Sequence, residues 1–182
     1  MRGFLSCAQE MLGGIDYESV LEVGCGPGDL AEALFPSEFN YLGIDIDANE
    51  IEKARNQYPH RTFEIGSTYE LPISSSAIDL VIACEVLEHL SQPQLALDEL
   101  DRVARKWILV SVPREPLWRM LNFARGKYWN SFGNTPGHLQ HFSQRALLAR
   151  LETKWQVCKV KSPLPWTMVL ACKRSLASNS QL

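Results

Sequence analysis

The chain has 182 residues, of which 46% are hydrophobic and 21% are charged, and this composition is typical of a single globular domain. Its formal net charge of -3 gives no global electrostatic reason to expect nucleic acid or an anionic membrane as a partner. The five cysteines are scattered, without a Cys-x-x-Cys pair or a Cys/His cluster at zinc spacing. We therefore expect a cytoplasmic protein with reduced thiols and no metal.

No apolar run approaches the roughly 20 residues of a membrane span, so we predict no such span. The sequence shows no internal repeat, and its last residues, from Arg174 onward, are small and polar. The expected organisation is one domain over residues 1–173, followed by a disordered tail over 174–182.

The first predicted strand covers residues 19–25, and it leads into the stretch “VLEVGCGPGDL” at 20–30. Gly24, Gly26 and Gly28 alternate in that stretch, just before a helical pattern. Backbone approaches a ligand closely only where side chains are absent, so Gly24 and Gly26 are candidates for close approach. A dinucleotide fingerprint needs a glycine three residues after Gly26, but Asp29 stands there and disfavours a phosphate at the helix N-terminus.

Further strands are predicted at 40–46, 77–84 and 106–112, with helical patterns between them. This alternation predicts βαβ units, a parallel sheet and a ligand site at the carboxyl ends of the strands. Asp45 ends the second strand, in the position where a carboxylate binds both ribose hydroxyls. A cofactor with a nucleoside but without phosphates indicates S-adenosylmethionine.

Two of the helices have clear start signals. Asp47 is the predicted N-cap of the first, which Pro59 ends, and Pro93 stands in the first turn of the second. On the outer face of the second helix, the spacing predicts two ion pairs four residues apart, namely Asp98 with Arg102 and Asp101 with Arg105.

The ordered set “VLEVGCGPGDLA”, “YLGIDID”, “GSTYELPI”, “IDLVIACEVLEHL” and “ALDELDRVA” resembles the motifs of class I S-adenosylmethionine-dependent methyltransferases, over about residues 18–112. It is most similar to the small-molecule subset of the methyltransferase type 11 kind. The resemblance implies an α/β, Rossmann-like, doubly wound sheet of seven mostly parallel strands in the order 3-2-1-4-5-7-6, with strand 7 antiparallel and helices on both faces. The last two strands would then be residues 154–161 and 166–173.

The resemblance also implies the cofactor site, residue by residue. The methionine part would lie among Glu22, Gly24, Cys25, Gly26 and Gly28, with Asp45 on the ribose and Ile46 beside the adenine. Ser67 and Thr68 would face the adenine amino group, and Cys84 and Glu85 would lie near the reacting sulfur. We interpret Cys25 as a small packed thiol, because methyl transfer from a sulfonium needs no covalent enzyme intermediate.

Residues 113–138 form an insert that is long for this kind of connection and rich in aromatic residues, and we interpret it as a substrate lid. Arg114, Trp118, Arg119 and His141 are predicted substrate contacts, and the cluster of cations predicts an acceptor with a carboxylate or phosphate. His138 is the candidate general base. The alternatives are an amphipathic helix with solvated arginines and histidines that order the loop.

The sequence thus predicts a methyltransferase that transfers a methyl group from S-adenosylmethionine to a small, acidic molecule, acting as a monomer or homodimer. The alternative is a protein that binds S-adenosylmethionine without turnover. Nucleic-acid methylation is disfavoured by the acidic balance, and a nicotinamide-dependent oxidoreductase is disfavoured by Asp29.

Overall fold

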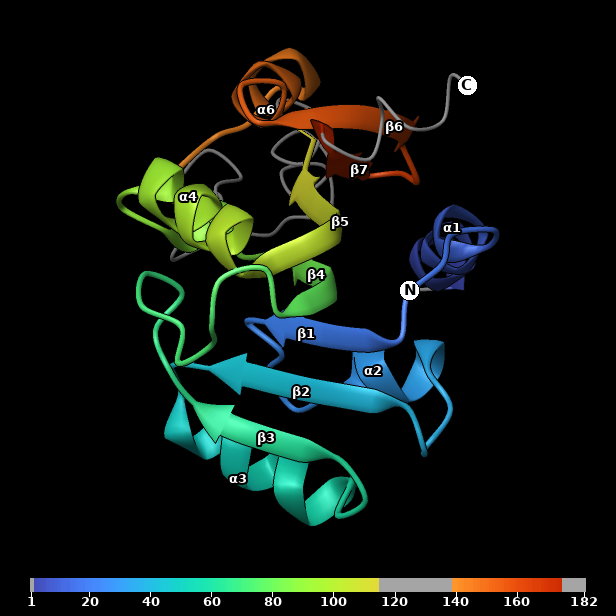
Figure 1. Cartoon of the computed structure of the whole chain (residues 1–182), viewed down its shortest axis with the longest axis vertical. Helices are drawn as coiled ribbons and strands as arrows, with labels where there is room; N and C mark the ends of the chain where they lie inside the picture. The colour runs from blue at the N-terminus through green and yellow to red at the C-terminus, as the bar shows by residue number, and fades with distance from the viewer. Residues whose placement is uncertain (1, 115–138, 175–182) are drawn as a thin grey trace, which may run out of the picture.

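The computed structural model describes residues 2–114 and 139–174, and the strands in these parts form a single sheet (Figure 1). The strand order is β3-β2-β1-β4-β5-β7-β6, and β7 runs antiparallel to both of its neighbours. The strands are β1 (Ser19–Val23), β2 (Asn40–Asp45), β3 (Thr62–Ile65), β4 (Ile78–Cys84), β5 (Ala104–Pro113), β6 (Trp155–Lys161) and β7 (Trp166–Lys173). The predicted fold class is confirmed, including the reversed last strand.

Helices cover both faces of this sheet, because alternate residues of its central strands are apolar on both sides. On β4, Leu80 and Ile82 pack in one apolar cluster, whereas Val81 and Ala83 pack in the other. The first cluster also takes buried residues from α1 (Arg2–Leu12), α2 (Asp29–Leu34) and α3 (Ala48–Gln57). The second takes them from η1 (Leu87–His89), α4 (Pro93–Val103) and α6 (Gln144–Leu151).

The carboxyl ends of the parallel strands meet at one edge, as the arrowheads of β1, β2 and β3 show (Figure 1). Helix α3 begins there with Asp47, whose side chain accepts a hydrogen bond from the backbone N–H of Asn49 at 2.8 Å, so the predicted N-cap is confirmed. The loops after β1, β2 and β4 therefore lie together.

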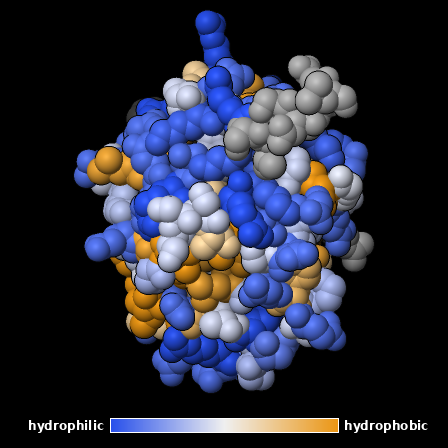
Figure 2. Space-filling view, viewed as in Figure 1, coloured by the Kyte–Doolittle hydropathy of each residue, from blue (hydrophilic) through white to orange (hydrophobic). Residues whose placement is uncertain are grey.

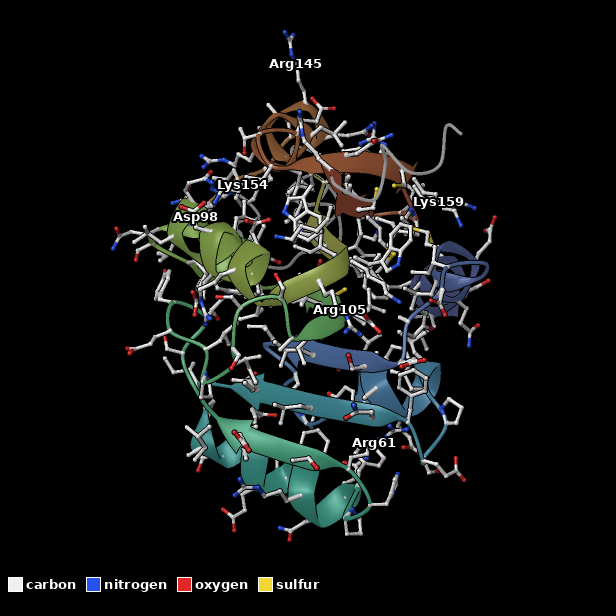
Figure 3. The ribbon with its side chains drawn as sticks, in the orientation of Figure 1. Arg61, Asp98, Arg105, Arg145, Lys154 and Lys159 are labelled. Atoms are coloured by element: carbon white, nitrogen blue, oxygen red, sulfur yellow. The ribbon has the colours of Figure 1, made fainter. Side chains whose placement is uncertain are left out.

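The predicted ion pair between Asp98 and Arg102 on α4 is wrong. Asp98 lies 2.8 Å from Lys154, near the start of β6, and the two side chains lie together in Figure 3. Arg102 pairs instead with Glu99 at 2.7 Å, one helical turn back. A lysine from a neighbouring element thus displaces the partner that helical spacing alone would assign.

The predicted pair between Asp101 and Arg105 is also wrong, because α4 ends at Val103 and places Arg105 on β5. Arg105 bonds to the buried carboxylate of Asp79 at 2.6 Å and holds the pKa of that group below its usual value. Lys173 of β7 binds Asp101 at 2.7 Å in its place.

Candidate active site

A cavity of about 610 Å³ opens at the carboxyl ends of β1 and β4. It brings together part of the predicted cofactor site, namely Glu22, Gly24, Cys25, Gly26, Cys84 and Glu85. Its remaining lining residues are Phe4, Leu5, Pro27, Asp29, Leu30 and Trp166. The rings of Phe4 and Trp166 pack edge to face, with 5.3 Å between their centres, so α1 and β7 close one side of the cavity.

The loop after β1 has left-handed backbone at both of its first glycines. Gly24 has φ 72°, its N–H donates to the carbonyl of Ile44 at 2.7 Å, and a Cβ built on it would lie 2.4 Å from Val86 Cγ2. Gly26 has φ 51°, and a Cβ there would meet no atom within 4 Å. The space beside Gly26 is thus open, whereas the space beside Gly24 is filled by Val86, and the close approach of a ligand to this loop stays a prediction.

Gly28 does not line the cavity, although the sequence placed it in the cofactor site. It is the N-cap of α2, with φ 84°, and a Cβ there would lie 2.7 Å from the ring of Phe63. The glycine at this position allows β3 to pack against the start of α2.

Asp45 is half-buried at the end of β2, and its carboxylate connects the loop after β1 with the loop after β2. Its Oδ2 accepts a hydrogen bond from the Gly26 N–H at 2.8 Å, and its Oδ1 accepts one from the Asp47 N–H at 2.9 Å. Each carboxylate oxygen can accept a second hydrogen bond, so the group retains capacity for a ligand. The carboxylate thus fixes the glycine loop and faces the same edge of the sheet.

Two exposed isoleucines lie at the carboxyl ends of β2 and β3. Ile46 is 75% exposed and Ile65 is 55% exposed, and Ile65 pairs in register with Asp45 across β2 and β3. Figure 2 shows apolar residues gathered over the region of these two strands. Ile46 was predicted to lie beside the adenine, and this stays a prediction; Ile65, which the sequence analysis missed, is a second exposed apolar residue at the same edge of the sheet.

Ser67 and Thr68 lie after β3 and are half-buried, but they are not among the residues that line the cavity. The hydroxyl oxygen of Ser67 accepts a hydrogen bond from the Tyr69 N–H at 3.2 Å, within a short turn. Their assignment to the adenine amino group stays a prediction.

Glu85, directly after β4, has a left-handed backbone with φ 60°, an uncommon conformation for a residue other than glycine. Its carboxylate accepts hydrogen bonds from Ser111 Oγ at 3.0 Å and from Trp166 Nε1 at 2.7 Å. Burial raises the pKa of Glu85 above its usual value, and these two donors oppose that shift. Burial also raises the pKa of the Cys84 thiol, which therefore stays protonated.

The sequence analysis missed Glu88, which is 1% exposed and lies in the η1 turn three residues after Glu85. Within the described parts of the chain, neither of its carboxyl oxygens has a hydrogen-bond partner. Burial, and then the nearby charge of Glu85, raise the pKa of Glu88. A buried carboxyl without a partner costs stability, and residues under such strain gather at functional sites.

The predicted substrate residues are only partly described. Trp118, Arg119, His138 and nearly all of the 113–138 insert lie outside the described residues. Arg114 is exposed, its backbone N–H donates to the Pro165 carbonyl at 2.9 Å, and it does not line the cavity. His141 is exposed. The backbone N–H groups of Leu139 and Gln140, just before it, both donate hydrogen bonds to the Glu88 carbonyl. The return of the insert thus lies beside η1.

No group of three His, Cys, Asp or Glu side chains suited to a metal ion occurs among the residues that the structure describes. Across those same residues, no helix is both long and apolar enough to cross a membrane.

Residues 21–107 match the family model of a methyltransferase domain. This segment is a methyltransferase domain. It contains most of β1, all of β2, β3 and β4, the glycine loop, Asp45 and Glu85, whereas Phe4, Leu5 and Trp166 of the cavity lie outside it. The resemblance to class I S-adenosylmethionine-dependent methyltransferases is confirmed, and S-adenosylmethionine is the cofactor of that family.

Two curated relatives extend the match beyond this domain. One, named “Probable S-adenosylmethionine-dependent methyltransferase” of Mycolicibacterium smegmatis, is 29% identical over 74% of this chain and 50% of its own length. Another, an uncharacterised 37.1 kDa protein in transposon TN4556 of Streptomyces fradiae, is 35% identical over 57% of this chain and 32% of its own length. The chain thus spans half or less of the length of these relatives.

Solved structures share the fold of the methyltransferase domain. Magnesium protoporphyrin IX methyltransferase from Synechocystis PCC 6803, solved with bound SAH, has a TM-score of 0.73 at 17% identity, covering 93% of this chain and 82% of that one. The PH0226 protein from Pyrococcus horikoshii OT3 has a TM-score of 0.77 at 14% identity, covering 95% and 90%. At such low identity the likeness establishes the fold and not the reaction.

Proposed function

We propose that the chain is an S-adenosylmethionine-dependent methyltransferase that acts on a small molecule. The observation that carries this proposal is Gly26: its N–H is held by Asp45 at 2.8 Å, and the space beside its Cα is open. A nucleoside linked to an amino acid, without phosphates, fits a loop that offers bare backbone next to a carboxylate for ribose hydroxyls.

In this proposal the cofactor lies along the carboxyl edge of the sheet. Its methionine part would contact Gly26 and approach Glu22 inside the cavity, its ribose would bond to Asp45, and its adenine would cover Ile46 and Ile65. The exposed apolar surface of the two isoleucines would then be buried by a flat ring, which is the favourable use of such a surface.

The acceptor would occupy the other side of the cavity, where Phe4, Leu30 and Trp166 form an apolar wall next to Glu85. The described lining carries carboxyl groups and no cationic side chain. We therefore propose an acceptor with an apolar body and a hydroxyl or amine nucleophile. The acidic group expected from the arginines is not part of this proposal, because Arg114 does not line the cavity.

The bound cofactor supplies a methyl group that the sulfonium already activates, so the protein must align the nucleophile and remove its proton. Glu85 is placed to remove the proton of the nucleophile, because its carboxylate lines the cavity and is oriented by the hydrogen bonds from Ser111 and Trp166. A carboxylate with a raised pKa is a more effective proton acceptor near neutral pH.

Calorimetry with S-adenosylmethionine tests the proposed function. The wild-type protein should bind it at one site, and Asp45→Ala should weaken binding by about tenfold to a hundredfold, the usual loss for hydrogen bonds to a charged group. Asp47→Ala is the matched control, because it removes a neighbouring carboxylate that caps α3 without taking part in the site. Equal affinity of the two variants would contradict the assignment.

A further inference from the structure

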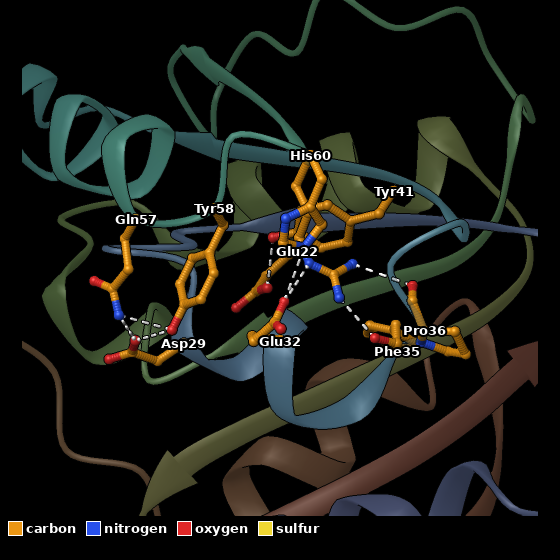
Figure 4. Close-up of polar contacts among 10 residues, drawn as sticks. Glu22, Asp29, Glu32, Phe35, Pro36, Tyr41, Gln57, Tyr58 and His60 are labelled. Carbon is orange, nitrogen blue, oxygen red and sulfur yellow. Dashed lines mark hydrogen bonds and ion pairs between the residues drawn. The ribbon is translucent and has the colours of Figure 1, made fainter.

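A line of polar side chains leads from the cavity to the surface on the side of α2 and α3. Tyr41 donates its hydroxyl hydrogen to Glu22 Oε2 at 2.7 Å, and Arg61 lies 5.5 Å from the centre of the Tyr41 ring. Arg61 Nε then donates to Glu32 Oε2 at 3.0 Å, and His60 lies 3.2 Å from the same oxygen. Figure 4 shows Glu22 and Tyr41 next to each other, with Glu32 and His60 beside them.

Glu22 is a carboxyl in the middle of the sheet. It lies on β1 between Gly43 of β2 and Ile82 of β4, and it is 3% exposed although it lines the cavity. Burial raises the pKa of Glu22 to about 8, so with the cavity empty the group is largely protonated at neutral pH. The titratable and charged groups that face it are Tyr41 and Asp45 of β2, Asp29 of α2, Cys25 and Cys84 at the ends of β1 and β4, and Arg61.

Tyr41 and Arg61 favour the ionised form of this carboxyl. The hydroxyl of Tyr41 and the positive charge of Arg61 both lower the pKa of Glu22, against the charges of Asp45 and Asp29. The guanidinium of Arg61 is fixed in turn, because it donates to the Phe35 carbonyl at 2.6 Å and to Glu32. Neither residue lines the cavity, so both act on a ligand only through Glu22.

This inference depends on the proposed function, because the ligand it considers is the cofactor. S-adenosylmethionine carries a sulfonium and an ammonium group, and a cation next to a buried carboxyl favours its ionised form. We propose that Glu22 binds the cofactor as a carboxylate, that binding therefore releases a proton, and that Tyr41 and Arg61 are positioning residues that lower the cost of that release.

The direction of the pH dependence follows from the protonated state of the empty site. The pKa of Glu22 is raised in the empty site, and the bound cation lowers it, so the cofactor competes with a proton. Below the pKa of Glu22 in the empty site, the affinity for the cofactor should rise by about tenfold for each unit by which the pH is raised. This slope corresponds to one proton released per bound cofactor. Between about pH 5.5 and 7 the α-amino group of the ligand stays largely protonated, since such groups titrate near 7.7 to 8.0.

The test is calorimetry with S-adenosylmethionine across this pH range, in two buffers that differ in their heat of ionisation. We expect the wild-type protein to release close to one proton at neutral pH. Glu22→Gln, which cannot ionise, should lose most of the pH slope and the released proton. Tyr41→Phe should keep the release but bind about tenfold to a hundredfold more weakly, since it removes a donor to a charged acceptor.

Tyr17→Phe is the matched control, because Tyr17 belongs to the same aromatic cluster, with its ring 6.2 Å from Phe35, but it does not bond to Glu22. A merely structural role of the Tyr41 hydroxyl would lower the free energy of unfolding of Tyr41→Phe but leave its affinity for S-adenosylmethionine equal to that of Tyr17→Phe and of the wild-type protein. That result would overturn the role of Tyr41.

The failure of this inference and the failure of the proposed function give different results. Wild-type binding of S-adenosylmethionine with the same affinity from about pH 5.5 to 7, and without a released proton, would overturn the inference and leave the proposed function intact. Absence of binding to the wild-type protein at every pH would overturn both.

Discussion

Gly26→Ala should lower the affinity for S-adenosylmethionine by at least tenfold, about 1.4 kcal/mol or more, while the protein stays folded. The reason is geometric: a Cβ at this position meets no protein atom within 4 Å, and the residue lines the cavity, so the added methyl group would enter the space of the ligand. The left-handed backbone, with φ 51°, should itself cost about 1–2 kcal/mol of stability. Calorimetry and chemical unfolding measure the two effects separately.

Gly24→Ala is the matched variant, two residues away and also at a positive φ. Its Cβ would collide with Val86, so we expect a further loss of about 1–3 kcal/mol in the free energy of unfolding, the usual cost of overpacking. If Gly26→Ala bound S-adenosylmethionine as the wild-type protein does, the glycine would serve the backbone conformation alone.

Glu85→Gln should lower the rate of methyl transfer by about 10²–10⁴, the usual contribution of a positioned acid or base. Glutamine preserves the shape and the acceptor oxygen toward Trp166 or Ser111 but cannot take a proton. The rate of the wild-type protein should rise with pH until Glu85 is ionised and then level off, because burial raises the pKa of this group. In Glu85→Gln that rise should be absent.

The measurement is formation of the demethylated cofactor in the presence of small phenols and aromatic amines, with calorimetry of S-adenosylmethionine as the control. We expect the affinity of the variant for the cofactor to stay near that of the wild-type protein. A loss of affinity without a change in rate at saturation would instead assign Glu85 to cofactor binding, as the sequence resemblance first implied. Cofactor binding without transfer to any acceptor would favour a protein that does not turn over.

The sheet and the edge that carries the site could be predicted because local signals mark them. Apolar runs bounded by turn residues indicated β1, β2, β4 and β5, and the end of the second run indicated Asp45, whereas Glu85 was implied by the resemblance to the family. In a parallel sheet the ends of such strands lie at one edge whatever the details of packing. Strand order and the reversed last strand came from the ordered motifs of the family.

The distinct roles of the glycines could not be predicted, because they depend on residues far away in the sequence. Val86 fills the space beside Gly24, and Phe63 fills the space beside Gly28. The sequence shows only that three glycines alternate. The packing of Phe63 of β3 and of Val86 after β4 decides which of the three glycines leaves open space for a ligand.

Other elements were missed for local reasons. β3 has a single buried side chain, Phe63, and thus no apolar run to mark it. α1 does carry helical spacing, since Phe4, Cys7, Ala8 and Met11 are all buried, but the sequence analysis made no prediction for this stretch. Nothing in the sequence marks Glu88 as buried, because a carboxyl is normally exposed.

The most direct test of this account is a crystal structure of the protein with S-adenosylhomocysteine, the demethylated cofactor. We predict electron density along the carboxyl edge of the sheet, with the amino-acid part against Gly26 and Glu22, both ribose hydroxyls on Asp45 and the adenine on Ile46 and Ile65. Density for the ligand elsewhere, or a cavity free of ligand in crystals grown at saturating concentration, would contradict the central claim that this loop and this carboxylate bind the cofactor.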